Sequence, residues 1–167
     1  IDMENDSLHP LRELDFIFHL ASRAFGIGYA NTHDIEMLRH NNAITNNFFD
    51  MISGSPKIKG VHLVSSSCVY SEGLDSIPVE SDWNWGFPEI GNAGYGWAKR
   101  TLEFAGILIQ KSARIEVTCS RPPNIYSERY IYKGRWSQAL PSIVVKAMRA
   151  DEAITIWGDG NQIRSYI

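Results

Sequence analysis

The sequence is poor in cysteine and in long apolar runs, and these two shortages exclude several classes of protein. Only two of its 167 residues are cysteine, Cys68 and Cys119, which are too few and too far apart for a disulfide framework. Because free thiols are typical of a reducing compartment, we expect a cytoplasmic protein. No apolar stretch approaches the roughly 20 residues that a membrane-spanning helix needs, so no membrane contact is expected.

The chain also lacks a large excess of either positive or negative charge. Lys and Arg number 16 and Asp and Glu number 19, which gives a net charge of −3 and argues against nucleic acid as a partner. The five histidines are not spaced with the cysteines as zinc ligands are, so no metal site is expected. Apolar residues make up 44% of the chain and charged residues 21%, which is ordinary for a globular domain with a hydrophobic core.

Short apolar runs alternate with segments of helical periodicity along the chain. The pattern predicts strands over 14–21, 59–67, 114–121 and, more briefly, 153–158, and helices over 34–53, 95–113 and 137–150. Glycine, proline and polar residues predict loops over 22–33 and 71–94. The strand–helix–strand order indicates an α/β fold with a doubly wound parallel sheet, in which ligands bind beyond the carboxyl ends of the strands.

Two residues at the start of the helix over 95–113 indicate acid–base chemistry. Tyr95 and Lys99 are four residues apart in the stretch NAGYGWAKR, so a helix places them on one face. We expect the Lys99 ammonium to lower the pKa of the Tyr95 phenol, which makes the phenol a candidate general acid or base. The alternative is an amphipathic helix on which the two residues have no special role.

Hydroxyl and thiol groups follow the second predicted strand in the stretch VSSSCVY. A serine there can hold a substrate hydroxyl beside Tyr95 while the carbon that bears this hydroxyl loses a hydride. Because side chains do not accept hydride, this chemistry needs a nicotinamide cofactor. A nucleophilic Ser or Cys with a His base is the rival interpretation, but these serines are not in the G-x-S-x-G turn typical of such hydrolases.

Six motifs together resemble one family of enzymes. DFIFHLAS, NNAITNN, VSSSCVY, YGWAK, SRPPNIY and IWGDGNQIRSYI occur in the order and at the approximate spacing of the extended short-chain dehydrogenase/reductases. The resemblance is to their NAD-dependent nucleotide-sugar epimerase/dehydratase branch, and it covers nearly the whole chain from Leu14 onward. The stretches LASRAFGIGY and SSSCVY look most like the GDP-mannose 3,5-epimerases and GDP-fucose synthases of that branch.

The resemblance implies roles for individual residues. The implied catalytic residues are Tyr95, Lys99, Ser66 and Cys68. The residues implied to bind the cofactor are His19, Leu20, Ala21, Tyr95, Lys99 and Pro122, and those implied to bind the substrate are Ser66, Asn124 and Arg164. Cys68 is either a second acid/base or a small packing residue at a strand end. To act as a base, its thiol would have to form a thiolate near neutral pH.

The resemblance also implies a reaction and its participants. A sugar hydroxyl would be oxidised transiently to a ketone, with NAD or NADP as cofactor and a nucleotide sugar as substrate. The alternatives are an NADPH-dependent 4-keto-sugar reductase and a non-catalytic NAD-binding scaffold.

Two parts of such an enzyme are not in the sequence: the glycine-rich turn for the cofactor pyrophosphate and most of the C-terminal substrate-binding region. We therefore expect residues 1–167 to be the central fragment of a Rossmann-like, NAD(P)-binding domain. Within it, residues 151–167 would open the substrate-binding region. We also expect the full-length protein to form a homodimer.

Overall fold

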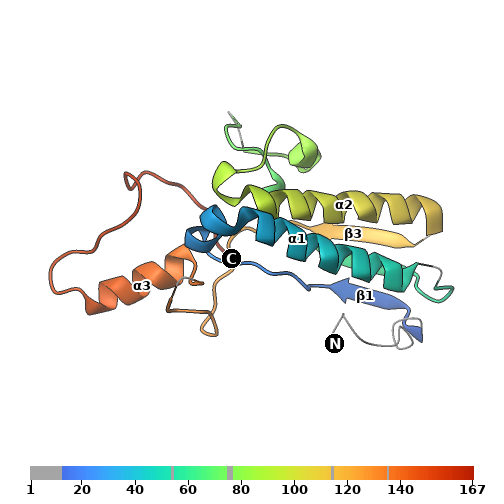
Figure 1. Cartoon of the computed structure of the whole chain (residues 1–167), viewed down its shortest axis with the longest axis horizontal. Helices are drawn as coiled ribbons and strands as arrows, with labels where there is room; N and C mark the ends of the chain where they lie inside the picture. Colours follow the sequence, from blue (N-terminus) through green and yellow to red (C-terminus); the bar gives the residue numbers. More distant parts are fainter. Residues whose placement is uncertain (1–12, 54, 75–76, 114, 135) are drawn as a thin grey trace.

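A computed structural model describes residues 13–53, 55–74, 77–113, 115–134 and 136–167. Its regular elements follow one another as strand, helix, strand, helix, strand, helix, with three short 3-10 helices in the loops (Figure 1). The elements are β1 (Phe16–His19), α1 (Ile27–Ile52), β2 (Gly60–Val64), η2 (Ser67–Val69), η3 (Glu80–Asn84), η4 (Ile90–Asn92), α2 (Ala93–Ala113), β3 (Glu116–Ser120) and α3 (Ala139–Arg149).

The three strands form one parallel sheet in the order β1-β2-β3. Phe16 pairs with Gly60 and Gly60 pairs with Glu116, so the three strands start level and their carboxyl ends reach the same edge. The predicted α/β fold with a parallel sheet is therefore confirmed. The strands are shorter than the apolar runs from which they were predicted.

Helices α1 and α2 lie side by side across one face of the sheet (Figure 1). Phe48 and Ile52 from α1, Leu102 from α2 and Val61 and Leu63 from β2 are all almost completely buried in one hydrophobic core. Burial of these side chains is the main force that holds the helices on the sheet. The two helices also contact each other closely, and this contact fixes where α2 begins relative to the strand ends.

Helix α1 begins earlier than predicted. Residues 27–33, assigned to a loop from the glycines around them, form a first helical segment that meets the rest of α1 at a kink. His33 has φ −133° and ψ 29° at that kink, and the hydroxyl of Thr32 donates to the Tyr29 carbonyl at 3.1 Å. The polar side chain thus satisfies a backbone group at the break in the helix.

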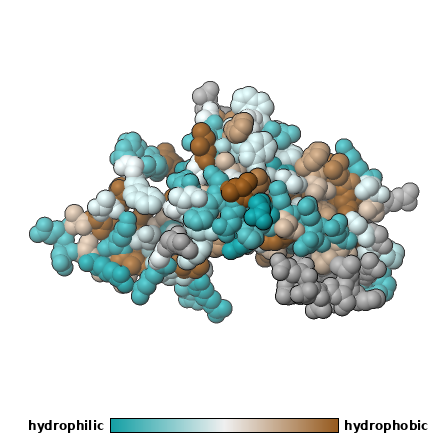
Figure 2. All heavy atoms as spheres, in the orientation of Figure 1, coloured by the Kyte–Doolittle hydropathy of each residue, from teal (hydrophilic) through white to brown (hydrophobic). Residues whose placement is uncertain are grey.

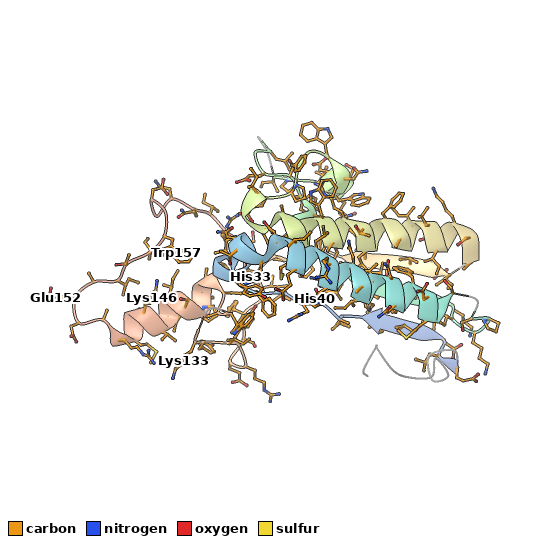
Figure 3. The ribbon with its side chains drawn as sticks, in the orientation of Figure 1. His33, His40, Lys133, Lys146, Glu152 and Trp157 are labelled. Atoms are coloured by element: carbon orange, nitrogen blue, oxygen red, sulfur yellow. The ribbon has the colours of Figure 1, made fainter. Side chains whose placement is uncertain are left out.

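The chain after α3 contains no strand over 153–158, so that prediction is wrong. The segment is instead mostly exposed, and the Lys146 ammonium donates to the Thr155 carbonyl at 3.1 Å. Figure 3 shows Lys146 on α3, with Glu152 and Trp157 on the chain that follows it. Farther on, Tyr166 forms a parallel bridge with Asn124, which brings the last residues back beside the end of β3. None of the described helices is long and apolar enough to cross a membrane.

Candidate active site

The carboxyl edge of the sheet gathers most of the residues singled out from the sequence. Backbone hydrogen bonds continue past the strands there, from the Ser65 amide to the Ser120 carbonyl at 2.8 Å and from the Ser67 amide to the Pro122 carbonyl at 3.0 Å. These bonds hold the turn after β2 against the turn after β3. The start of α2 lies over the same edge because α2 packs against η2.

Two glycines let the start of α2 approach its neighbours closely. The backbone amide of Gly94 donates to the Asp34 carboxylate of α1 at 2.9 Å, and a Cβ at Gly94 would lie 2.1 Å from the Asp34 carbonyl oxygen. A Cβ at Gly96 would lie 2.6 Å from the Cys68 carbonyl oxygen. Because Tyr95 stands between these two glycines, the contacts with α1 and η2 fix the position of its ring.

Tyr95 and Lys99 lie on one face of α2, as their spacing predicted. The Lys99 ammonium is 5.5 Å from the centroid of the Tyr95 ring, and it donates a hydrogen bond to the Val64 carbonyl at 2.8 Å. Only 4% of Lys99 is exposed, and this burial lowers the pKa of its ammonium to about 8. The ammonium therefore remains mostly charged at neutral pH.

The expectation that Lys99 lowers the pKa of Tyr95 is wrong for this structure. Burial of the phenol dominates and raises the pKa of Tyr95 to about 12. Hydrogen bonding from the Ser22 and Ser66 hydroxyls opposes this rise in the pKa of Tyr95. The Lys99 ammonium lies beside the ring and is directed to the end of β2, so its charge does not offset the loss of solvent around the phenol.

Ser66 and Cys68 lie together at the turn after β2. The Ser66 hydroxyl accepts a hydrogen bond from the Cys68 amide at 3.2 Å and so caps η2. The Cys68 thiol accepts a hydrogen bond from the Asn92 side-chain amide at 3.3 Å. Burial raises the pKa of the Cys68 thiol, so the thiolate near neutral pH that a base role requires is not favoured in this structure.

The predicted cofactor residues of β1 and β3 occupy the same edge. His19 is buried at the end of β1, where its ring stacks on Phe48 with 4.0 Å between centroids. Burial, together with the positive charge of Lys99, lowers the pKa of His19 to about 4, so the imidazole is neutral at pH 7. Leu20 and Ala21 follow it and are exposed, whereas Pro122 is held against the turn after β2.

The predicted substrate residues lie at the outer side of this edge. The Asn124 side chain donates to the Ser165 carbonyl at 3.2 Å, so it is joined to the returning C-terminal segment. Arg164 of that segment forms an ion pair with Glu89 at 2.7 Å. Both charges act on the pKa of Cys68, Glu89 raising it and Arg164 lowering it. Arg164 is thus brought near Cys68 although 96 positions separate them in the sequence.

The residues at this edge fit a polar ligand such as a dinucleotide. Among the described residues, four buried side-chain atoms have no hydrogen-bond partner, and two of them belong to His19 and Ser65 at the ends of β1 and β2. A third is the Oδ1 atom of Asn92, whose amide group contacts Cys68. Buried polar atoms without partners are costly, so a ligand that hydrogen-bonds to them would be favoured. The described residues contain no group of three or more side chains placed to hold a metal ion.

Comparison with known proteins identifies related chains. A model of the NAD dependent epimerase/dehydratase family matches residues 3–167. Over 98% of its length the chain is 29% identical to GDP-mannose 3,5-epimerase and 32% identical to UDP-glucuronic acid decarboxylase 4, both from Arabidopsis thaliana. It covers 44% and 36% of those two proteins, respectively.

Solved structures share the fold at lower identity. UDP-N-acetylglucosamine 4-epimerase from Methanobrevibacter ruminantium M1, in complex with UDP-N-acetylmuramic acid, has a TM-score of 0.81 at 22% identity. That match covers 100% of this chain and 52% of the other. A GDP-L-fucose synthetase from Naegleria fowleri bound to NADP has a TM-score of 0.79 at 19% identity, and the match covers 96% of this chain and 54% of the other.

Proposed function

Because the chain belongs to the NAD-dependent epimerase/dehydratase family, we propose that the complete protein is an NAD(P)-dependent nucleotide-sugar epimerase or dehydratase. Residues 1–167 would form the central part of its NAD(P)-binding domain, with residues 151–167 opening the substrate-binding region. The observation that carries the proposal is the meeting of Ser66, Tyr95 and Lys99 at the carboxyl edge of a parallel sheet.

Each of these three residues has a distinct task in the proposed reaction. Ser66 donates a hydrogen bond that orients the sugar hydroxyl, and Tyr95 removes the hydroxyl proton as the carbon becomes a ketone. Lys99 places a positive charge beside the Tyr95 ring, and its N–H groups are suited to hold a ribose hydroxyl. Bound NAD or NADP would supply the acceptor for the hydride of the sugar carbon and the donor for its later return.

His19, Leu20, Ala21 and Pro122 would line the cofactor side of the site. Neutral His19 suits this position, because a buried imidazole with an unpartnered nitrogen can hydrogen-bond to a ligand without adding charge. Leu20 and Ala21 are exposed and offer apolar surface to a flat ring. Lys99 lies between this side and Tyr95, which supports its double task.

The substrate side of the site would be formed by Asn124 and Arg164. Arg164 is exposed enough to reach a phosphate, and a guanidinium matches the geometry of phosphate oxygens. Its present partner is Glu89, so a bound nucleotide sugar would exchange one anionic partner for another. GDP-linked and UDP-linked sugars are both candidates, since the related proteins are named for sugars of both kinds.

We infer that Cys68 acts as the second acid/base, next to the transient ketone. The carbon adjacent to a ketone is acidic, and once a base has removed its proton, the neutral thiol that the structure favours can donate a replacement proton and become a thiolate. Replacing Cys68 by serine should therefore stop incorporation of deuterium from D2O at that carbon while reduction of the bound cofactor continues. Mass spectrometry of the recovered sugar measures the first effect, and cofactor absorbance measures the second.

The alternative for Cys68 is a small packing residue. If the Cys68→Ser variant still incorporates deuterium at the rate of the wild-type enzyme, the thiol is assigned to packing. A Cys119→Ser variant is the matched control because it removes the other free thiol of the described chain. It should leave the incorporation unchanged.

Cofactor stoichiometry tests the proposed function against a 4-keto-sugar reductase. The full-length protein would be incubated with GDP-mannose, UDP-glucuronic acid and related nucleotide sugars at a substoichiometric amount of cofactor. An epimerase or dehydratase converts many sugar molecules per cofactor molecule because the hydride is returned within the cycle. Conversion that stops after one equivalent of NADPH would identify a reductase instead.

The cellular setting and assembly are part of the same proposal. The free thiols of Cys68 and Cys119 suit a cytoplasmic enzyme. A homodimer is supported by hydrophobic side chains of α2 that reach the surface, among them the half-exposed Phe104 and Leu108. Figure 2 shows hydrophobic side chains at the surface of this face, among hydrophilic ones. Apolar surface of this kind is typical of an interface between subunits.

A further inference from the structure

Asn92 ends the 3-10 helix η4, directly before α2, and its side chain reaches the Cys68 thiol. The amide nitrogen of Asn92 donates a hydrogen bond to the Cys68 sulfur at 3.3 Å, across 24 positions of the sequence. The contact joins the start of α2 to the turn after β2, which carries Ser66 and Cys68. Asn92 was not among the residues to which the sequence assigned a role.

The backbone of Asn92 has little freedom to move. Its amide donates to the Glu89 carbonyl at 3.0 Å, which closes the turn of η4. A Cβ at the neighbouring Gly91 would lie 3.0 Å from the Ile27 side chain of α1, and η4 packs against both α1 and α2. The amide of Asn92 is therefore presented to the thiol from a fixed support.

Cys68 is held just as closely on its side of the contact. Its backbone amide donates to the Ser66 hydroxyl at 3.2 Å, and its carbonyl oxygen would lie 2.6 Å from a Cβ at Gly96. The freedom that Cys68 retains is rotation of its side chain. The hydrogen bond from Asn92 restricts that rotation and so sets where the sulfur lies.

The Asn92 amide makes little use of its hydrogen-bonding capacity while the thiol is neutral. Its Oδ1 atom is buried and has no hydrogen-bond partner among the described residues. Its nitrogen faces a thiol sulfur, which is only a weak acceptor. Because a buried amide paired in this way costs stability, stability does not explain why an asparagine stands here.

The same amide fits a thiolate well. A thiolate only accepts hydrogen bonds, so it needs a donor, and the amide nitrogen of Asn92 already faces the sulfur. A hydrogen bond to a charged partner is also stronger than one to a neutral partner. Burial raises the pKa of the Cys68 thiol, and the hydrogen bond from Asn92 opposes that rise.

We propose that Asn92 is a positioning residue for Cys68, whose amide nitrogen fixes the sulfur and stabilises the thiolate that remains after Cys68 has donated its proton. The inference rests on the proposed function, in which Cys68 is the second acid/base. In that step the S–H bond breaks, a C–H bond forms at the carbon next to the ketone, and the electron pair of the S–H bond stays on sulfur. The thiolate then regains a proton from water before the next cycle.

Other charged and titratable groups surround the Cys68 thiol, and the test must leave them in place. They come from the loop before η4, from the C-terminal segment and from α2, and they are Glu89, Arg164, Tyr95 and Lys99. Replacing Asn92 by leucine keeps a side chain of similar size and changes none of these charges. The thiol can therefore be compared between variants in the same electrostatic surroundings.

The first experiment measures the rate at which iodoacetamide alkylates Cys68 in the full-length protein between pH 7 and pH 9, with mass spectrometry of the peptides. Below the midpoint of its titration, a thiol reacts in proportion to its thiolate fraction. In Asn92→Leu this rate should fall about tenfold, which corresponds to a rise of about one unit in the pKa of Cys68 when one hydrogen bond to a charged group is lost. Asn92→Asp keeps the shape but replaces the donor with an anion, and it should slow alkylation at least as much.

The direction of the change separates this role from a purely structural one. A variant that merely loosened the site would expose Cys68, lower its pKa and speed alkylation. Cys119 is the internal control in every sample, and its alkylation rate should not change. Asn84→Leu makes the same substitution at an exposed position of η3 and should leave Cys68 at its wild-type rate. An Asn92→Leu rate within twofold of wild type, or above it, would overturn the inference.

A kinetic readout separates this inference from the proposed function. In Asn92→Leu, incorporation of deuterium from D2O at the carbon next to the ketone should fall about three- to tenfold, because Cys68 becomes a weaker acid. Reduction of the bound cofactor should stay within about twofold of wild type, since Ser66, Tyr95 and Lys99 are unchanged.

The outcomes distinguish the two claims. If Cys68→Ser stops incorporation but Asn92→Leu leaves it at the wild-type rate, the role of Asn92 fails and the proposed function stands. If Cys68→Ser still incorporates deuterium, the role of Asn92 fails as well, because Asn92 acts through Cys68. If the wild-type protein oxidises no sugar, the proposed function fails, and the alkylation rates still decide whether Asn92 stabilises the thiolate.

Discussion

Replacement of Tyr95 by phenylalanine should lower kcat for sugar oxidation by about two to four orders of magnitude, the usual contribution of a positioned acid or base. The substitution removes one oxygen atom and keeps the ring that lies 5.5 Å from the Lys99 ammonium. The turn after β2 and the two flanking glycines remain as they are, so the site should keep its shape. Steady-state kinetics of the full-length protein with its nucleotide sugar measures the effect.

Cofactor binding should survive the same substitution. Lys99 keeps its hydrogen bond to the Val64 carbonyl, and we expect the dissociation constant for NAD(P) to change by less than about threefold. Tyr132→Phe is the control, because its phenol contacts the Ser127 carbonyl away from α2 and should not affect kcat. Activity of Tyr95→Phe within tenfold of wild type would remove Tyr95 from the catalytic role.

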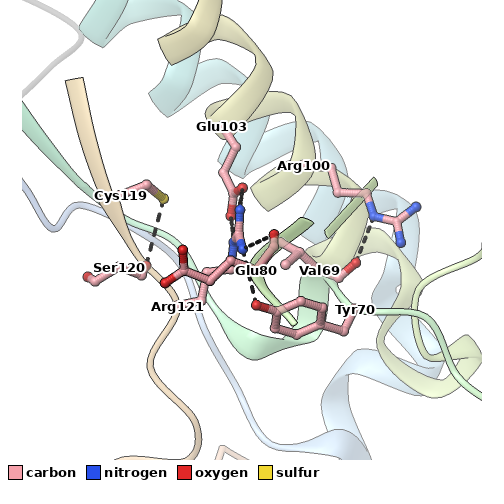
Figure 4. Close-up of polar contacts among 8 residues, drawn as sticks. All are labelled: Val69, Tyr70, Glu80, Arg100, Glu103, Cys119, Ser120 and Arg121. Atoms are coloured by element: carbon pink, nitrogen blue, oxygen red, sulfur yellow. Dashed lines mark hydrogen bonds and ion pairs between the residues drawn. The ribbon is translucent and has the colours of Figure 1, made fainter. Parts of the chain in front are cut away.

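Replacement of Arg121 by methionine should destabilise the protein by about 3–5 kcal/mol, the cost of leaving a buried charge without its partner. Arg121 follows β3, and its guanidinium pairs with the Glu103 carboxylate of α2 at 2.8 Å (Figure 4). The same guanidinium donates to the Tyr70 hydroxyl at 3.1 Å and to the Glu80 carbonyl at 2.7 Å. It thus joins β3, α2 and the loops that follow β2.

The size of the effect follows from the burial of Glu103, whose side chain is only 4% exposed. Burial lowers the pKa of Arg121, but hydrogen bonding to Glu103 and Tyr70 outweighs burial and raises the pKa above its usual value. These contacts therefore favour the charged guanidinium. Urea denaturation gives the free energy of unfolding. A double variant, Arg121→Met with Glu103→Leu, should recover most of the loss because no unpaired charge then remains.

An exposed ion pair provides the comparison. Lys59 pairs with Asp15 at 2.6 Å, and both side chains are more than half exposed. Lys59→Met should leave the free energy of unfolding nearly unchanged, because water already screens the exposed pair. A loss for Arg121→Met no larger than this would mean that the buried pair does not hold the strand ends together.

The sheet was predictable from the sequence because its three strands are apolar runs that end in polar turns. Their parallel direction followed from the intervening helices. The start of α1 was not predictable, since Gly26 and Gly28 indicate a loop and only the fold shows the segment packed as a helix. The stretch over 153–158 has the composition of a strand, but a strand also needs a partner, and composition does not supply one.

The site was predictable where local spacing decides the geometry. Helical periodicity placed Tyr95 and Lys99 together, and the family resemblance singled out Ser66 from the serines after β2. Asp34 was missed because its carboxylate contacts the Gly94 amide of α2 across 60 positions of sequence. The rise in the pKa of Tyr95 was missed for the same reason, since it comes from burial by elements far apart in the chain.

Reduction of the bound cofactor within a single turnover is the most direct test of the central claim. The claim is that Tyr95, Ser66 and Lys99 promote the oxidation of a sugar hydroxyl by the cofactor. The full-length protein, loaded with oxidised NAD(P), would be mixed rapidly with each nucleotide sugar while the absorbance of the reduced nicotinamide is recorded. We predict a burst of reduced cofactor with at least one sugar in the wild-type protein and none in Tyr95→Phe. Tight cofactor binding without such a burst for any sugar would contradict the enzymatic role and leave a cofactor-binding scaffold.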